Sequence, residues 1–146
     1  MGIEIKDYVD RAKNEPTRER IEEMWRAVFL LQGWYFLPSR SDDGPAFPTV
    51  VEIDKEPWVL IFTNVREIKT FARQQGRSTS DGSTPLLVLD PLESMERILA
   101  EKKTLAGAIF NPDSEATFRA PLEALEAYAH HFGLPLDGGE SNEESS

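Results

Sequence analysis

Four polar side chains stand at or just after the ends of predicted strands, where they could do chemistry together: Thr63, Asn64, Asp90 and Asn111. If those strands are parallel, the four side chains lie along the carboxyl edge of one sheet, where open α/β folds usually bind ligands. The edge is therefore a candidate site for binding or converting a small molecule. Asn64 and Asp90 also stand where helix N-caps are expected, each with a glutamate three residues later, and this structural role is the favoured interpretation.

Four aromatic side chains are candidates for contact with a protein partner: Trp34, Tyr35, Phe36 and Trp58. In an extended strand Trp34 and Phe36 face one side, while Tyr35 faces the other. This strand is therefore either buried on both faces or exposes an aromatic patch to a partner. Burial is the favoured interpretation, because apolar residues on both faces are expected where helices cover a sheet.

Other residues able to catalyse reactions are few. The chain has no cysteine, which excludes disulfides, thiolate nucleophiles and thiolate metal sites. Its histidines, His130 and His131, are adjacent, so on a helix they point about 100° apart and do not share a metal. Near a helix C-terminus they are better explained as surface groups that complement the helix dipole. No Gly-x-Ser-x-Gly turn is present, and the sequence predicts no catalytic residue, metal ligand or cofactor.

Two loop patterns superficially suggest ligand sites. Residues 76–84 are rich in glycine, serine and threonine, but they lack the lysine and the glycine spacing of a phosphate loop and lead from a helix into a strand. The acidic pieces 42–44 and 81–82 do not continue into a calcium-binding pattern. A connecting loop and ordinary turns explain these segments better.

The chain is acidic, with 26 Asp and Glu residues against 16 Lys and Arg residues and a net charge of −10. A field of this sign repels phosphate backbones and anionic lipid, so we predict neither nucleic acid nor membrane as a partner. No run approaches 18 apolar residues, and the N-terminus does not have the pattern of a signal peptide. The predicted location is therefore cytoplasmic.

Hydrophobic periodicity predicts the elements that position these residues. Helices are expected on either side of Asn14, with the second ending at Gly33, and again after Asn64, Asp90 and Pro121. Strands are expected at 34–37, 47–53, 58–63, 86–89 and 105–110.

The predicted fold is therefore α/β (α+β), with a mixed sheet of about five strands. An antiparallel hairpin is followed by a β-α-β-α-β unit over residues 58–110, whose three strands are expected to be parallel neighbours. The N-terminal and C-terminal helices pack on the sheet. Residues 1–136 form one domain, and residues 137–146 form a disordered acidic tail, because they contain no aliphatic or aromatic side chain.

Three segments of this pattern, 34–38, 59–64 and 106–112, resemble the N-terminal domain of the SseB family. In that family an aromatic strand ends in Pro, a strand similar to Ile61-Phe62-Thr63 ends at a helix cap, and a late strand ends in Asn-Pro. The resemblance covers roughly residues 16 to 130. It implies a bacterial, cytoplasmic α/β domain of unsettled biochemical role, without active-site residues to transfer, and longer members carry a second domain that has no counterpart here.

Three functions follow as hypotheses. The leading one is a non-enzymatic protein-interaction or regulatory module. The alternative is a small-molecule binding protein or enzyme that uses the carboxyl edge of the sheet, which requires a pocket of at least about 300 Å³ there. The third is a structural protein that associates with itself.

Overall fold

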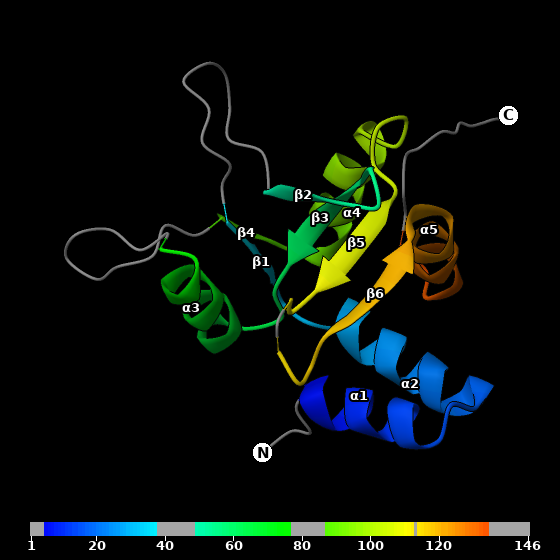
Figure 1. Ribbon diagram of the computed structural model, residues 1–146. Coiled ribbons are helices and arrows are strands. Elements are labelled where there is room, and N and C mark those ends of the chain that lie inside the picture. The colour runs from blue at the N-terminus through cyan, green and yellow to red at the C-terminus, as the bar shows by residue number, and fades with distance from the viewer. Residues whose placement is uncertain (1–4, 38–48, 77–86, 113, 135–146) are drawn as a thin grey trace, which may run out of the picture.

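The computed structural model of the protein describes residues 5–37, 49–76, 87–112 and 114–134. The helices of this part are α1 (Ile5–Asn14), α2 (Arg18–Phe29), α3 (Val65–Gln74), α4 (Pro91–Ala100) and α5 (Leu122–His131) (Figure 1). Its strands are β1 (Trp34–Phe36), β2 (Val50–Ile53), β3 (Glu56–Ile61), β4 (Leu87–Leu89), β5 (Gly107–Phe110) and β6 (Phe118–Pro121). The predicted tail, the loop 77–84 and the acidic pieces 42–44 and 81–82 lie outside the described residues.

Local signals set most helix ends where the sequence predicts them. Gly76 and Gly133 follow α3 and α5 with left-handed φ values of 67° and 84°, which glycine adopts without strain. The end of α2 is an exception, because this helix stops at Phe29 and not at Gly33. The ring N–H of Trp34 donates to the Val28 carbonyl at 2.9 Å, so a carbonyl of the last helical turn is satisfied by a residue of β1.

The centre of the fold is a four-stranded sheet with the order β2-β3-β5-β6. β2 and β3 form the predicted antiparallel hairpin, and Asp54 and Lys55 turn it with φ values of 53° and 70°, as a two-residue hairpin turn requires. β3 and β5 are parallel neighbours, and β6 returns antiparallel to β5. The predicted fold class, a mixed sheet with helices packed on it, is confirmed.

The position of β4 differs from the prediction of three adjacent parallel strands. β4 pairs antiparallel with β1 in a two-stranded sheet, which joins the larger sheet through one bridge between Tyr35 and Phe62. β1 thereby occupies the position beside the end of β3, and β4 reaches only the outer edge of β1. The sequence pattern also did not predict β6, whose four residues include a proline and only one large apolar side chain.

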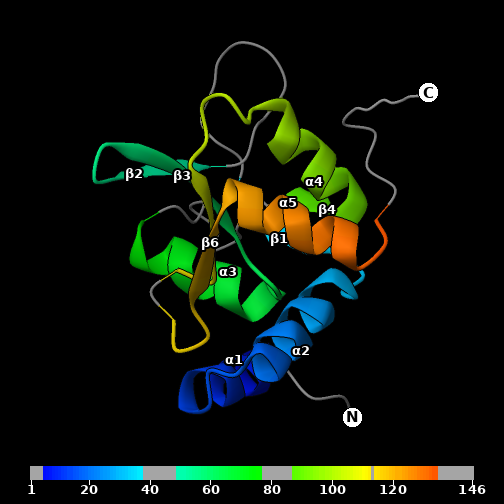
Figure 2. The same ribbon diagram turned by 90° about the vertical axis from the view of Figure 1, so that its right-hand side faces the viewer.

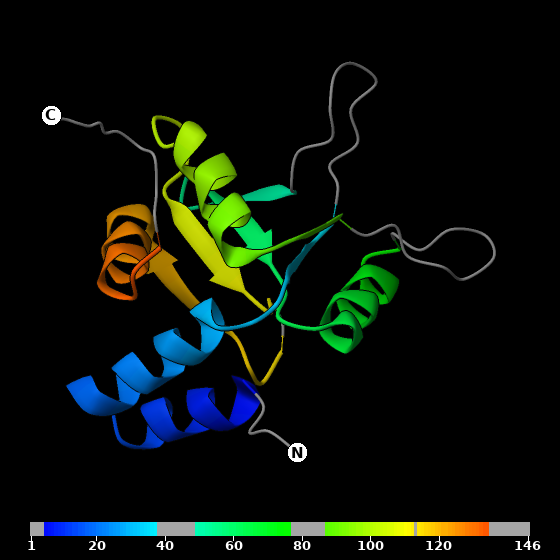
Figure 3. The same ribbon diagram turned by 180° about the vertical axis from the view of Figure 1, so that it is seen from behind.

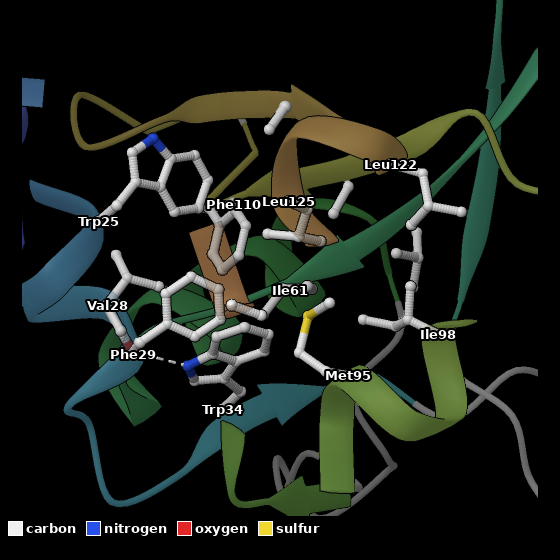
Figure 4. Close-up of a cluster of buried hydrophobic side chains, with 14 of the residues drawn as sticks. Trp25, Val28, Phe29, Trp34, Ile61, Met95, Ile98, Phe110, Leu122 and Leu125 are labelled. Atoms are coloured by element: carbon white, nitrogen blue, oxygen red, sulfur yellow. Dashed lines mark hydrogen bonds between the residues drawn. The ribbon is translucent and has the colours of Figure 1, made fainter. Parts of the chain in front are cut away.

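Helices cover the two faces of the sheet unequally. α1, α2, α4 and α5 build the larger apolar core on one face, where Trp34 and Phe110 meet Trp25 and Leu125 (Figure 4). Viewed from behind, α4 lies across this face (Figure 3), and α4 and α5 lie side by side (Figure 2). Of the described helices, α3 alone packs on the other face. In the described part of the chain, no helix is long and apolar enough to cross a membrane.

Candidate functional site

Thr63 and Asn111 meet at the carboxyl ends of the parallel strands β3 and β5, as the sequence predicts. The Asn111 side-chain oxygen accepts a hydrogen bond from the Thr63 amide at 3.0 Å, and the Asn111 side-chain amide donates to the Thr63 hydroxyl at 3.0 Å. Both residues are buried. Asn111 has a left-handed φ of 50°, which asparagine adopts more readily than most residues. The polar groups of Thr63 and Asn111 therefore hydrogen-bond to each other in the protein interior.

Asn64 and Asp90 are helix N-caps, as the favoured interpretation of the sequence expects. The Asn64 side chain accepts from the Glu67 amide at 2.8 Å, and the Asp90 side chain accepts from the Glu93 amide at 2.7 Å. Asp90 follows β4, which lies on the far side of β1 from β3. β1 is antiparallel to both strands, so β4 runs in the same direction as β3 and Asp90 lies at the same end of the strands as the other three residues. It is not adjacent to them, however, because β1 lies between.

The cap role predicts a modest effect on stability. Asn64→Ala and Asp90→Ala should each lower the free energy of unfolding by about 1 kcal/mol, because each leaves an amide of the first helical turn without its acceptor. Urea denaturation measures this loss. The matched controls Asn64→Asp and Asp90→Asn keep a side-chain acceptor and should stay within about 0.5 kcal/mol of the wild type. An alanine variant as stable as the wild type would contradict the cap role.

A hollow of about 640 Å³ opens at this edge, between α1, α2 and the start of α3. The described residues that line it are mostly apolar: Ile5, Tyr8, Ala27, Leu30, Leu31, Thr63, Asn64, Val65 and Arg66. Leu30 is 74% exposed on its rim. Neither Asn111 nor Asp90 is among these lining residues, and none of them is a carboxylate or a histidine. The hollow has the size of a ligand site, but its described lining provides no acid–base pair.

A second hollow, of about 530 Å³, lies at the turn between α1 and α2 and contains Arg11 and Arg20. Arg20 is paired on both sides, with Glu15 at 3.0 Å and Glu23 at 3.2 Å. The hydrogen bond from Arg20 to Glu15, and then the one to Glu23, raise the pKa of the guanidinium above its ordinary value. This arginine is thus already engaged by carboxylates and does not offer a free cation to an anionic ligand.

The two histidines lie at the C-terminal end of α5, as predicted, and both side chains are more than half exposed. His131 contacts Glu22 of α2 at 3.0 Å, and His130 lies 3.9 Å from Glu126. They face different partners and so do not form one site. Within the described segments, no group of three or more His, Cys, Asp or Glu side chains is placed to hold a metal ion.

The aromatic strand β1 is buried on one face and partly buried on the other, which agrees with the favoured interpretation of the sequence more than with an exposed patch. Trp34 (Figure 4) and Phe36 are 0% exposed in the larger core. Tyr35 is half-buried on the other face. Trp34 and Phe36 therefore do not form the exposed patch of the alternative interpretation. The physical reason is that β1 lies between β3 and β4, while Phe29 of α2 covers Trp34 on one face and α3 contacts the strand.

Trp58 is placed differently, on the face of the sheet opposite Trp34, and it is half-buried. Its ring lies close over Gly107, where an added Cβ would come within 2.6 Å of the Trp58 Cζ3 atom. The Arg119 guanidinium lies over the same ring, 5.1 Å from its centroid, in a cation–π arrangement. Arg119 is exposed and makes no ion pair with another described residue.

These two side chains belong to a larger apolar surface, which we call the open sheet face. Strand register places its members on one side of the sheet: Val51, Ile53, Trp58, Leu60, Ile109 and Arg119. α3 packs at one side of this face, and in Figure 1 no described helix lies in front of β2, β3, β5 and β6. A groove of about 510 Å³ follows the face. Phe71 of α3 and Gln75, just after that helix, form one wall, and Thr117, just before β6, is also in the lining.

The sequence pattern singles out Trp58 but gives no sign of Gly107 or Arg119 as its neighbours. Arg119 lies in the unpredicted strand β6, so nothing placed it beside Trp58. The signal that could have found the strand is the alternation in Phe118-Arg119-Ala120, where an arginine stands between two apolar residues. No model of a protein family, no curated protein and no solved structure matches the chain.

Proposed function

We propose that this protein is a non-enzymatic protein-interaction module, of a regulatory kind, that binds a partner protein through the open sheet face. The observation that carries the proposal is the stacked pair of Trp58 and Arg119 on an apolar sheet face without a covering helix in the described residues. Tryptophan and arginine are the side chains that most often dominate the binding energy of interfaces.

The residues around Trp58 and Arg119 have the composition that is usual in a protein–protein interface. Val51 and Ile53 are half-buried, and Leu60 and Ile109 form an apolar floor beside them. An apolar centre that a partner can dehydrate, with polar groups such as Gln75 and Thr117 at its margin, is the usual arrangement. The open groove has no enclosed reaction chamber, which suits a protein surface better than a small substrate.

The SseB-like membership and the cytoplasmic location form part of the same proposal. They rest on the order and spacing of the three sequence motifs, which occupy β1, the end of β3 and β5 with its following turn. The partner, in this proposal, is neither nucleic acid nor membrane, since the net charge of −10 opposes both.

A small molecule bound in the hollow at the carboxyl edge is the second candidate function. Its support is the volume of about 640 Å³ with Thr63 and Asn64 in the lining. The case for this second function is weakened because both side chains are already hydrogen-bonded, Thr63 to Asn111 and Asn64 to the Glu67 amide. Fewer polar groups are therefore left for a ligand. Ligand-observed NMR with a fragment library tests it: fragments that shift the amides of Leu31 and Val65, and not those of the open sheet face, would favour this function.

Site-specific photocrosslinking in cells tests the leading proposal. A benzoylphenylalanine in place of Thr117, in the groove, should give a discrete adduct with another protein, and a further Arg119→Glu change should abolish it. The control position is Glu96, which is exposed on α4 across the sheet, and it should give no such adduct.

Two outcomes would overturn the proposal. Equal adducts from both positions would show that contact is not specific to the open sheet face. An adduct of the protein with itself, together with a dimer mass in light scattering, would replace a partner protein by self-association.

A further inference from the structure

We infer that the segment bound on the open sheet face is an amphipathic helix of the partner protein that places one carboxylate on Arg119. This inference rests on the proposed function and adds the shape and the chemistry of the partner. Two independent observations lead to it, one from the layers of the fold and one from the charge in the groove.

The helical shape of the bound segment is inferred from the unequal covering of the two faces of the sheet. One face carries α4 and α5, with α2 beside them, whereas on the other face α3 reaches only part of the strands (Figures 1 and 3). The central strands β3 and β5 are parallel, and parallel strands are usually covered by helices on both faces. The groove between Phe71 of α3 and Arg119 of β6 therefore has the position of one further helix packed beside α3.

The carboxylate on the bound helix is inferred from Arg119, which has no carboxylate partner among the described residues. Arg119 is the one charged side chain among the described residues that line this groove. Arg20 and Arg97 contact glutamates within the chain, but Arg119 has no such partner among the described residues. A cation–π contact uses the charge of the guanidinium and none of its N–H groups as a hydrogen-bond donor to oxygen, so Arg119 can still offer the two parallel hydrogen bonds that match a carboxylate.

A carboxylate fits this site better than a phosphate, because a doubly charged phosphate needs more cationic donors than one arginine. A second copy of this chain fits less well, since two chains of net charge −10 repel each other. The same repulsion limits the partner's own acidity. The bound helix should therefore carry an isolated carboxylate beside its apolar stripe, with neutral or basic residues elsewhere.

Selection from a phage-displayed helix library tests the inference. The library holds amphipathic helices of about 18 residues, roughly five turns, with a fixed apolar stripe and random residues beside it. Helices retained by the wild-type protein should be enriched about tenfold in Asp or Glu at one stripe-flanking position, the preference expected of a desolvated arginine–carboxylate contact. Arg119→Gln should remove this preference, and Arg119→Glu should replace it by Lys or Arg. The matched control Arg97→Gln, on α4, should leave it unchanged.

Each result decides one claim. Helices that require Trp58 for binding but show no preference for Asp or Glu would overturn the claim that a carboxylate binds Arg119. The proposed function would still stand. Absence of any retained helix, while the crosslink from position 117 persists, would overturn the helical partner alone. Loss of both would overturn the inference and the proposed function together. Circular dichroism of Arg119→Gln and of Trp58→Phe, which keeps an aromatic ring, verifies that both variants are folded.

Discussion

Gly107→Ala should destabilise the protein by about 3 kcal/mol, near the upper end of what overpacking usually costs. An added Cβ would overlap the carbonyl oxygen of Ala120 and lie 2.9 Å from the Pro121 Cα, and both are backbone atoms of the paired strand β6. It would also press on the Trp58 ring at 2.6 Å. The backbone of a paired strand cannot rotate away as a side chain can, so β5 and β6 must separate or Trp58 must leave its place.

Urea denaturation measures this loss, and Gly33→Ala is the matched control. The Cβ at Gly33 would meet the Val88 side chain at 2.9 Å, but that side chain is 51% exposed and can turn into solvent. The control should therefore cost less than about 1 kcal/mol. Tryptophan fluorescence of any folded Gly107→Ala protein should report a more exposed Trp58. Equal stabilities of the two variants would show that the close approach at Gly107 is not a constraint on the fold.

Asn111→Ala should also cost about 3 kcal/mol. The substitution leaves the buried Thr63 amide without its acceptor, which costs about 1–3 kcal/mol. It also places alanine at a φ of 50°, where a side chain with a Cβ but without a polar group costs roughly 1–2 kcal/mol. The two causes act at one residue, at the point where β3 and β5 end side by side.

Asn111→Gly separates the two causes. Glycine accepts the left-handed backbone but restores no hydrogen bond, so it should recover about 1 kcal/mol of the alanine loss. Thermal and urea unfolding of both variants measure the difference. If glycine restores the wild-type stability in full, the hydrogen bonds to Thr63 contribute nothing. If glycine is no better than alanine, the backbone conformation contributes nothing.

Local features of this protein were predictable because they depend on groups within a few residues. The cap at Asp90 needs only the amide of Glu93, and the turn at Asp54 and Lys55 needs only the two strands that it joins. The helix face that Ile68 and Phe71 bury follows from helical periodicity. The end of α2 was misjudged because its last turn is completed by Trp34, a residue of the next element.

The candidate sites depended on contacts between distant segments. Thr63 and Asn111 were expected together because β3 and β5 were expected to be parallel, which is correct. Asp90 was expected beside them and lies at the same end of the strands, but it is not adjacent, because the antiparallel strand β1 lies between β3 and β4. Which tryptophan is accessible was likewise undecided by the pattern, since Trp34 and Trp58 both lie in apolar strands.

The fold class, the caps and turns, the acidic charge and the lack of cysteine chemistry follow from the order and types of the residues alone, because composition belongs to the chain and caps and turns use hydrogen bonds between neighbouring residues. The fold was needed to see that the described helices cover one face of the sheet only in part and that Arg119 lies over Trp58 on that face. Strand order is the reason. The pairing of β5 with both β3 and β6 brings residues 58, 107 and 119 together, and the free energy of that pairing comes from packing that no local pattern reports.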